Sequence, residues 1–214
     1  MTNRRIGIMG GSFNPPHLGH LAMAHEAKRR LDLTEVWFLV SPQNPLKSTA
    51  AMAPFADRVQ MCRLLAAHVP WLHVSTLENR FHTTRTAQTL TRLKLALPDC
   101  ELVWLMGSDN LATMHRWWRW RLLARQVGMA VFTRPGVPQQ GLRSPAATTL
   151  RPYRRPATQR RLSAGTWCLL PNPAWQMSAT AVRHSLSEGG QTPQLHPAVR
   201  DWIQLKNLYQ NPIT

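Results

Sequence analysis

The chain has 214 residues, of which 43% are hydrophobic, so it can bury the core of one ordinary domain. Its 26 Lys and Arg against 10 Asp and Glu give a formal net charge of +16, which suits phosphorylated ligands, but the basic residues are too scattered to form one nucleic-acid-binding stripe. No apolar run approaches the ~20 residues that span a bilayer and no signal-peptide pattern is present, so we expect a cytoplasmic protein without a membrane partner. Cys62, Cys100 and Cys168 form no CxxC pair, which predicts reduced thiols.

Short apolar runs alternate with segments of helical composition along the chain. Strands are predicted at residues 6–9, 36–40, 72–75, 102–106, 129–132 and 167–170. Helices are predicted from about residue 17 to 30 and at residues 54–67, 86–95, 111–125, 181–187 and 197–206. This alternation predicts an α/β fold, with a Rossmann-like, doubly wound parallel sheet and helices on both of its faces.

The remaining stretches complete the expected organisation. Residues 134–155 are rich in Pro, Gln, Gly and Arg without a clean period, which predicts a mobile surface loop. No repeat or linker is evident, so we expect a single domain over residues 1–214, with a small helical part from about residue 177 to 214. In a parallel sheet of this kind, ligands bind outside the carboxyl ends of the strands.

The segment directly behind the first predicted strand is the most informative part of the chain. It reads Gly10-Gly11-Ser12-Phe13-Asn14-Pro15-Pro16-His17-Leu18-Gly19-His20. The paired glycines predict a sharp exit from the strand, and the helix that follows presents backbone N–H groups without intrahelical partners. Together with the helix macrodipole, these N–H groups predict a phosphate-binding loop. The spacing fits neither a dinucleotide fingerprint nor a P-loop.

Two histidines, His17 and His20, stand three residues apart on the first turn of that helix. Both imidazoles can therefore reach one ligand, and Gly19 between them lets the ligand approach the backbone. Two other interpretations stay open. The pair could bind a metal, although helical zinc pairs more often use a spacing of four and no cysteine lies nearby. The two rings could also serve only to cap and pack the helix.

The His17-x-Gly19-His20 pattern resembles the signature of the HIGH nucleotidyltransferase superfamily, and Met177-Ser178-Ala179-Thr180-Ala181-Val182-Arg183 resembles its second motif, ISSTxxR. Within that superfamily the chain is most similar to the bacterial nicotinate-nucleotide adenylyltransferases, over nearly its whole length. Four further segments resemble parts of that family: Thr86-Ala87-Gln88-Thr89-Leu90, Gly107-Ser108-Asp109, Arg134-Pro135-Gly136 and Leu208-Tyr209. Arg85 stands where the family has a tyrosine.

The resemblance implies transfer of AMP from ATP to nicotinate mononucleotide, which forms nicotinate adenine dinucleotide and pyrophosphate in NAD biosynthesis. It also implies Mg²⁺ as the cofactor that accompanies ATP. Other acceptors stay open, such as nicotinamide mononucleotide or phosphopantetheine. A basic nucleic-acid-binding protein with a vestigial loop is the alternative from another class, and the oligomeric state is open as well.

On this resemblance, the two motifs would supply the catalytic residues His17, His20 and Arg183. The imidazoles would contact the ATP phosphates and stabilise charge on the α-phosphoryl group, while the guanidinium would hold the β- or γ-phosphate. Arg183 could otherwise be a solvated arginine on a capped surface helix. The other ATP-binding residues expected from the resemblance are Gly10, Gly11, Ser12, Phe13, Gly19, Gly107, Asp109, Met177, Ser178 and Thr180.

The acceptor is expected to meet a separate group of residues. Thr86 opens a helix, so its backbone N–H is predicted to bind the nicotinate carboxylate, from which a neutral carboxamide would gain less. Trp117 falls where the family has a tryptophan that stacks on the nicotinate ring. Trp118 is a further candidate for substrate contact, although core packing is the favoured interpretation for it and for Trp120.

Several expected contacts have equally plausible structural roles. Asp109 either accepts hydrogen bonds from the adenosine ribose or caps the helix predicted at residue 111. Lys47 and Arg134 either meet the phosphate of the mononucleotide or are solvated loop charges. Asn14, a further expected substrate contact, stands where the family usually has aspartate, and Leu46 replaces a common histidine.

Overall fold

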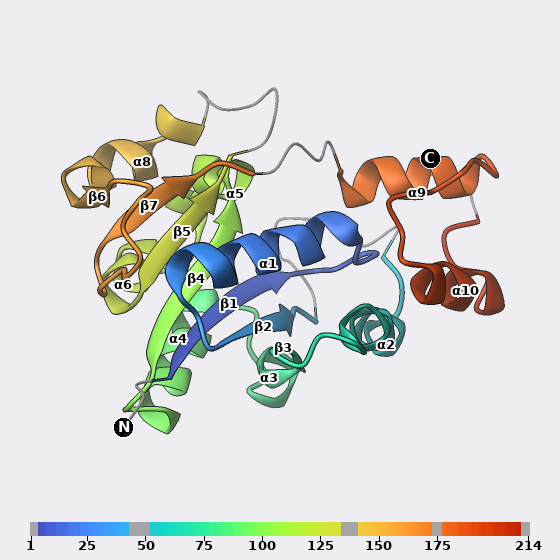
Figure 1. Cartoon of the computed structure of the whole chain (residues 1–214), viewed down its shortest axis with the longest axis horizontal. Helices are drawn as coiled ribbons and strands as arrows, with labels where there is room; N and C mark the ends of the chain where they lie inside the picture. Colours follow the sequence, from blue (N-terminus) through green and yellow to red (C-terminus); the bar gives the residue numbers. More distant parts are fainter. Residues whose placement is uncertain (1–3, 43–51, 134–140, 173–176, 211–214) are drawn as a thin grey trace.

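A computed structural model describes residues 4–42, 52–133, 141–172 and 177–210 (Figure 1). Its centre is one parallel sheet in the order β3-β2-β1-β4-β5-β7-β6. The strands are β1 (Arg5–Gly11), β2 (Glu35–Val40), β3 (Leu72–Ser75), β4 (Glu101–Gly107), β5 (Gly128–Phe132), β6 (Arg154–Arg155) and β7 (Trp167–Leu170). The prediction of an α/β, doubly wound parallel sheet is confirmed, and only the two-residue strand β6 was not predicted.

Helices of this α/β fold connect the strands and extend beyond the last one. They are α1 (Leu18–Leu31), α2 (Phe55–Ala66), α3 (Leu77–Arg80), α4 (Thr86–Ala96), α5 (Ser108–Thr113), α6 (Trp120–Gln126), α8 (Pro145–Leu150), α9 (Ala179–Ser187) and α10 (Pro197–Leu205). Short 3-10 turns lie at η1 (Met114–Arg116) and η2 (Arg151–Tyr153). None of the helices in the described ranges is long and apolar enough to cross a bilayer.

Side chains that alternate along the strands build two hydrophobic cores, one on each face of the sheet. On β4, Val103 and Leu105 pack into the core beneath α1 and α2, whereas Trp104 and Met106 pack into the core beneath α4 and α6. Figure 1 shows α1 lying across one face of the sheet. From β1 the chain adds β2 and β3 on one side of the sheet and then crosses to the other side, where it adds β4 and β5. A ligand crevice is expected where the strand order reverses in this way, at the carboxyl ends of β1 and β4.

The C-terminal helices sit beyond the carboxyl end of β1, beside α2 (Figure 1). Val199 and Ile203 of α10 are buried in the same core as Val59 and Cys62 of α2. The packing brings residues near the end of the chain next to the loop that follows β1. All three cysteines are free thiols, as predicted.

The segment predicted as one helix over residues 111–125 is broken, so that prediction is wrong. α5 and η1 end before Trp117, whose backbone is extended, and Arg119 adopts a left-handed conformation with φ 50° before α6 begins. The helix-like spacing of apolar residues continues on both sides of the break, because Leu111 and Leu123 are buried in the same core. A hydrophobic pattern reports burial and does not reveal a local left-handed residue.

The prediction of a mobile loop over residues 134–155 is wrong from α8 onward, and residues 134–140 lie outside the described part of the chain. The Ser144 hydroxyl accepts a hydrogen bond from the N–H of Ala147 at 3.2 Å, and Pro145 occupies the first turn of α8. Ala147 and Leu150 are buried. The Ser-Pro pair is an N-terminal helix signal that the loop-like composition masked.

The paired glycines of the phosphate loop belong to β1 and do not form the turn. Gly10 is required by packing, because a Cβ at this position would lie 2.2 Å from the Trp104 ring. The left-handed residue of the loop is Phe13, with φ 46°, and the Asn14–Pro15 peptide bond is cis. The predicted sharp exit from the strand therefore comes two residues later than the glycines indicated.

Candidate active site

The two sequence motifs meet in space although 169 residues separate them. The Arg183 Nη1 of α9 donates a hydrogen bond to the backbone oxygen of Asn14 at 2.8 Å. A Cβ on Gly19 would lie 3.2 Å from Cβ of Met177. Ser178 caps α9 by accepting from the N–H of Ala181 at 3.1 Å, which aligns the helix that carries the arginine. The first turns of α1 and α9 thus face the same loop.

The rings of the two histidines lie in contact, tilted by 36° to each other, at the start of α1. His17 is the N-cap residue and is 5% exposed, and its ring centroid lies 3.9 Å from that of His20. The backbone N–H of His17 donates to Nδ1 of His20 at 3.2 Å. Nδ1 must therefore carry a lone pair, so the His20 ring is neutral with its proton on Nε2. This tautomer makes His20 a hydrogen-bond donor through Nε2.

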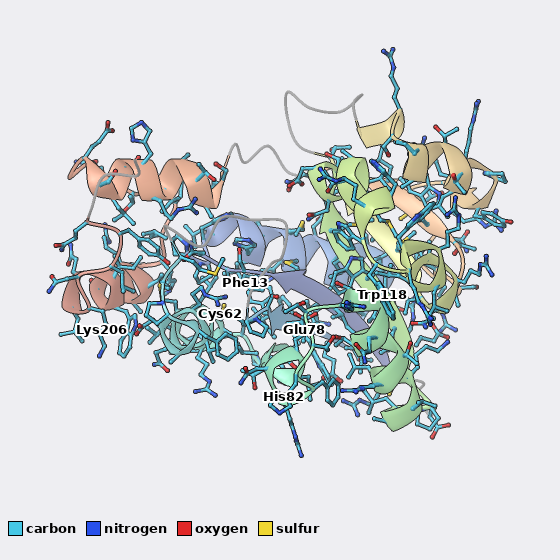
Figure 2. The ribbon with its side chains drawn as sticks, turned by 180° about the vertical axis from the view of Figure 1, so that it is seen from behind. Phe13, Cys62, Glu78, His82, Trp118 and Lys206 are labelled. Carbon is cyan, nitrogen blue, oxygen red and sulfur yellow. The ribbon has the colours of Figure 1, made fainter. Side chains whose placement is uncertain are left out.

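Phe13, an expected ATP contact, is 2% exposed and packs beneath the histidines. Its ring stacks on Phe38 with centroids 4.8 Å apart and lies 5.0 Å from the ring of His20. Figure 2 labels Phe13 within the middle of the molecule. Its side chain supports the His20 ring from below, so any contact with a nucleotide would involve the Phe13 backbone.

Asn14, whose predicted contact with the substrate stays a prediction, forms a junction inside the protein. It is 6% exposed, and its Oδ1 accepts hydrogen bonds from the N–H of Ala53 at 2.9 Å and from the hydroxyl of Tyr209 at 2.7 Å. Its backbone oxygen also accepts a hydrogen bond from Nη1 of Arg183. One residue therefore ties the phosphate loop to the C-terminal part of the chain.

Replacing Tyr209 with phenylalanine is expected to weaken this junction without creating a cavity. Loss of one partly buried hydrogen bond should lower the free energy of unfolding by about 1 kcal/mol. Because Arg183 shares the junction, the KM for ATP, the substrate that the sequence resemblance implies, should rise. Urea unfolding and steady-state kinetics measure the two effects. Tyr153, which is 52% exposed, provides the matched control as Tyr153→Phe. Equal behaviour of the two variants would contradict the role assigned to Tyr209.

Arg58 of α2 holds the two loops at the carboxyl ends of β1 and β2. Its side chain is buried, with the residue 1% exposed, and it donates to four backbone oxygens: Ala53 at 3.0 Å and Ser12, Ser41 and Pro42 at 2.7 Å each. Burial lowers the pKa of this guanidinium from its ordinary value. The arginine was not singled out from the sequence, because its partners are backbone atoms of distant loops.

A cavity of about 390 Å³ lies beside the phosphate loop, at the carboxyl ends of β1 and β4. Six predicted site residues line it: Gly10, Gly11, Ser12, Thr86, Trp117 and Trp118. The other lining residues were not predicted as site residues: Ser41, Glu78, Thr84, Arg85, Trp104, Asn110, Arg116 and Leu123. Ser41 could have been found, because it directly follows a predicted strand and the carboxyl ends of strands form such crevices.

Tryptophans form the walls of this cavity. Trp104 and Trp117 meet edge to face, with centroids 6.5 Å apart. Trp118 is 41% exposed and lies between the guanidinium groups of Arg85 and Arg119, so the favoured interpretation of core packing is wrong for it. For Trp120, which is 7% exposed, core packing is confirmed. The left-handed Arg119 separates the cavity-lining pair from the core residue.

Glu78, which Figure 2 labels, is a buried residue whose carboxyl group belongs to the lining of the same cavity. It is 4% exposed, and the Thr89 hydroxyl lies 3.5 Å from its Oε1. Burial raises the pKa of Glu78 to about 7, although hydrogen bonds from Ser41 and Thr89 act in the opposite direction. The helix that carries it, α3, is only one turn long and has no periodic pattern to predict it.

Glu78 should make the stability of the protein depend on pH. The pKa of Glu78 is about 7 in the folded state and near 4.5 when the group is exposed. The contribution of Glu78 to the free energy of unfolding is therefore fully present below pH 4.5 and is lost as pH rises through 7. In Glu78→Gln, the fall in unfolding free energy between pH 5 and pH 8 should be smaller by roughly 1 to 3 kcal/mol. Urea unfolding at the two pH values measures it. The exposed Glu188 provides the control as Glu188→Gln, and an unchanged pH dependence in Glu78→Gln would refute the assignment.

Two further predicted residues, Gly107 and Asp109, are described by the structure but do not line the cavity. Gly107 ends β4 and is the N-cap of α5, so the alternative of Asp109 as that cap is wrong. Asp109 is exposed in the first turn of α5 and does not line the cavity, and its predicted ribose contact stays a prediction. Lys47, Leu46 and Arg134 lie outside the described residues.

Metal ligands are not assembled here. In the described part of the chain, no three His, Cys, Asp or Glu side chains come together in a way that could hold a metal ion. The groups at the loop are imidazoles, a guanidinium and backbone N–H groups, which donate hydrogen bonds to phosphate oxygens, whereas Mg²⁺ prefers oxygen ligands. The site is therefore built for anionic oxygens and does not fit a protein-bound Mg²⁺.

The loop behind β1, the paired histidines and the second-motif arginine converge at the carboxyl end of a parallel α/β sheet, and this arrangement suits the class of nucleotidyltransferases. A family model described as cytidylyltransferase-like matches residues 8–185. A curated relative from Brucella abortus, named "Probable nicotinate-nucleotide adenylyltransferase", is 40% identical over 183 residues, which cover 83% of this chain and 93% of the relative. A relative of the same name from Gluconobacter oxydans is 43% identical over 185 residues, 85% of this chain and 94% of the relative.

The fold comparison agrees with the sequence comparisons. A solved structure of Plasmodium falciparum nicotinic acid mononucleotide adenylyltransferase complexed with NaAD superimposes with a TM-score of 0.75 at 18% identity, over 99% of this chain and 100% of that chain. This chain belongs to the cytidylyltransferase-like family and, within it, to the nicotinate-nucleotide adenylyltransferases.

Proposed function

We propose that this protein transfers AMP from ATP to nicotinate mononucleotide and releases pyrophosphate, forming nicotinate adenine dinucleotide for NAD biosynthesis. One observation carries the proposal beyond the family membership. Gly10, Gly11 and Ser12 belong to the phosphate loop and also line the tryptophan-walled cavity. A flat aromatic ring in the cavity and a triphosphate at the histidines would therefore lie on the two sides of one loop, within reach of each other.

In the proposed reaction the 5′-phosphate of the mononucleotide is the nucleophile. Its second pKa is about 6, so it is mostly dianionic at neutral pH and needs no general base. One of its oxygens forms a bond to the α-phosphorus of ATP, and the bond from that phosphorus to the bridging oxygen of the β-phosphate breaks. The electron pair leaves with pyrophosphate. The protein's part is to bring two anions together and to stabilise the charge that develops.

Each residue of the two motifs has a proposed role in that task. Nε2–H of the neutral His20 donates to an oxygen of the α-phosphoryl group, and His17 lies against it and contacts the neighbouring phosphate. Arg183 is held by the Asn14 carbonyl through Nη1, while its buried Nε has no hydrogen-bond partner within the described ranges. The other N–H groups of this guanidinium are proposed to donate hydrogen bonds to the β- or γ-phosphate.

Mg²⁺ is proposed to arrive with ATP, bound by the phosphate oxygens of the nucleotide. The described residues do not fit a protein-held site, so no step of the protein's chemistry is assigned to the ion. The adenosine ribose is assigned to Asp109, and the nicotinate carboxylate is assigned to the N-terminal end of α4 at Thr86.

A pyrophosphate-release assay tests this function. With ATP and nicotinate mononucleotide the protein should turn over, and with nicotinamide mononucleotide or phosphopantetheine it should be much slower. Equal or higher turnover with either of those acceptors would overturn the choice of substrate. Strong salt-dependent binding of RNA or DNA without pyrophosphate release from any acceptor would overturn the enzyme assignment.

A further inference from the structure

The cavity beside the phosphate loop contains few charged groups. Its only described cationic side chains are those of Arg85 and Arg116, and its only described carboxyl group is that of Glu78. Glu78 is engaged with Ser41 and Thr89. The two acceptors that must be distinguished differ in one substituent, a carboxylate in the acid and a neutral carboxamide in the amide. A guanidinium is the side chain best suited to tell them apart.

Arg85 lies at the exposed edge of the cavity, where hydrogen bonds fix its backbone and Trp118 contacts its guanidinium. Its backbone N–H donates to Oγ1 of Thr83 at 3.1 Å, and its carbonyl accepts from the N–H of Gln88 at 2.9 Å as α4 begins. The guanidinium carbon lies 4.8 Å from the centroid of the Trp118 ring. Stacking of this kind orients the plane of the guanidinium while leaving its N–H groups to form hydrogen bonds at the edge.

The charge on Arg85 is not neutralised within the described structure. No Asp or Glu of the described residues forms an ion pair with it, in contrast to Arg4, Arg5, Arg29 and Arg30, each of which pairs with a carboxylate. Its neighbour Thr86, the first residue of α4, lines the same cavity. An anion placed there would meet the guanidinium and the positive end of the helix together.

We propose that Arg85 is a specificity-determining residue whose guanidinium pairs with the ring carboxylate of nicotinate mononucleotide and selects the acid over the amide. The inference rests on the proposed function and deepens it. A carboxamide offers only one neutral oxygen and would turn an N–H₂ group toward another donor, so it gains less from the same guanidinium.

The test compares kcat/KM for the acid and amide mononucleotides in Arg85→Gln. Loss of a charge-assisted hydrogen bond predicts a fall of about 10- to 100-fold for the acid and little change for the amide, so the acid-to-amide ratio should fall by the same factor. The KM for ATP should stay unchanged. Arg85→Lys keeps the charge but not the planar pair of donors and should recover part of the ratio.

Arg119 offers a matched control, because its guanidinium also stacks on Trp118, at 4.7 Å, but does not line the cavity. Arg119→Gln should leave the acid-to-amide ratio unchanged. The inference is overturned if Arg85→Gln keeps the wild-type ratio, if it slows both acceptors equally, or if Arg116→Gln removes the preference instead. In each of these cases the wild-type enzyme still prefers the acid, so the proposed function stands and only the role of Arg85 is refuted. A wild-type enzyme that uses both acceptors equally, or neither, would instead contradict the proposed function.

Discussion

Replacement of His20 by alanine is expected to lower kcat for pyrophosphate release by about 10²- to 10³-fold, the usual cost of removing one donor to a developing oxyanion. The neutral ring is fixed by the His17 N–H at Nδ1 and supported from below by Phe13, so its Nε2–H is preorganised. Because the donor acts most strongly on the pentavalent α-phosphoryl group, the KM for ATP should change much less than kcat. Steady-state kinetics with saturating mononucleotide separate the two parameters.

His25 provides the control for this prediction. It lies on the same helix, is exposed, and contacts Trp71 at a centroid distance of 4.6 Å. His25→Ala should retain near-normal kcat, and both variants should unfold within about 1 kcal/mol of wild type if only the chemistry is affected. If His20→Ala keeps kcat within tenfold of wild type, the imidazole does not stabilise the transition state. If it unfolds at much lower urea, its effect is structural.

Arg58→Met is expected to lower the free energy of unfolding by about 3 kcal/mol or more, the largest stability effect anticipated for a single side chain here. Methionine has a similar length but donates no hydrogen bond, so the four backbone oxygens that Arg58 now satisfies would lose their donor in a largely buried site. Urea-induced unfolding followed by circular dichroism measures the change.

Activity should fall in Arg58→Met as well, because the same guanidinium joins the loops that hold Ser12 and Ser41, both of which line the cavity. The KM values for both substrates should rise together. Arg63 is an exposed arginine of the same helix, and Arg63→Met should change stability by less than about 0.5 kcal/mol. A loss below about 1 kcal/mol in Arg58→Met would show that water replaces the guanidinium at these oxygens.

Much of the site could be predicted from residues that are close in sequence. His17 and His20 lie on one helical turn, Ser178 precedes a helix as its cap, and Thr86 begins α4, so local spacing was sufficient for each. The break at Arg119 and the helix behind Ser144 were missed for the opposite reason. Each depends on a single residue, the left-handed backbone of Arg119 in one case and the capping hydroxyl of Ser144 in the other. Whether one residue adopts such a conformation or contact depends on the packing around it.

Contacts between distant segments could not be predicted in the same way. Asn14 meets Tyr209 across 195 residues, and Arg58 meets the carbonyl of Ser12 across 46. Neither contact leaves a periodic or compositional trace, because each depends on how loops from different strands approach one another. Glu78 is a similar case, since its raised pKa results from burial by elements that precede and follow it in the chain.

The order of apolar and polar residues was enough to predict the parallel sheet, because periodicity and helix starts are local properties of a chain. The two motifs could be found because each is a short run of neighbouring residues that resembles a family signature. The assembly of those motifs around one loop, the cavity with its cationic edge at Arg85, and the tautomer of His20 were decided only by the folded structure. The physical reason is that hydrogen bonds, burial and electrostatic potential depend on distances in space, which the sequence specifies only through the complete fold.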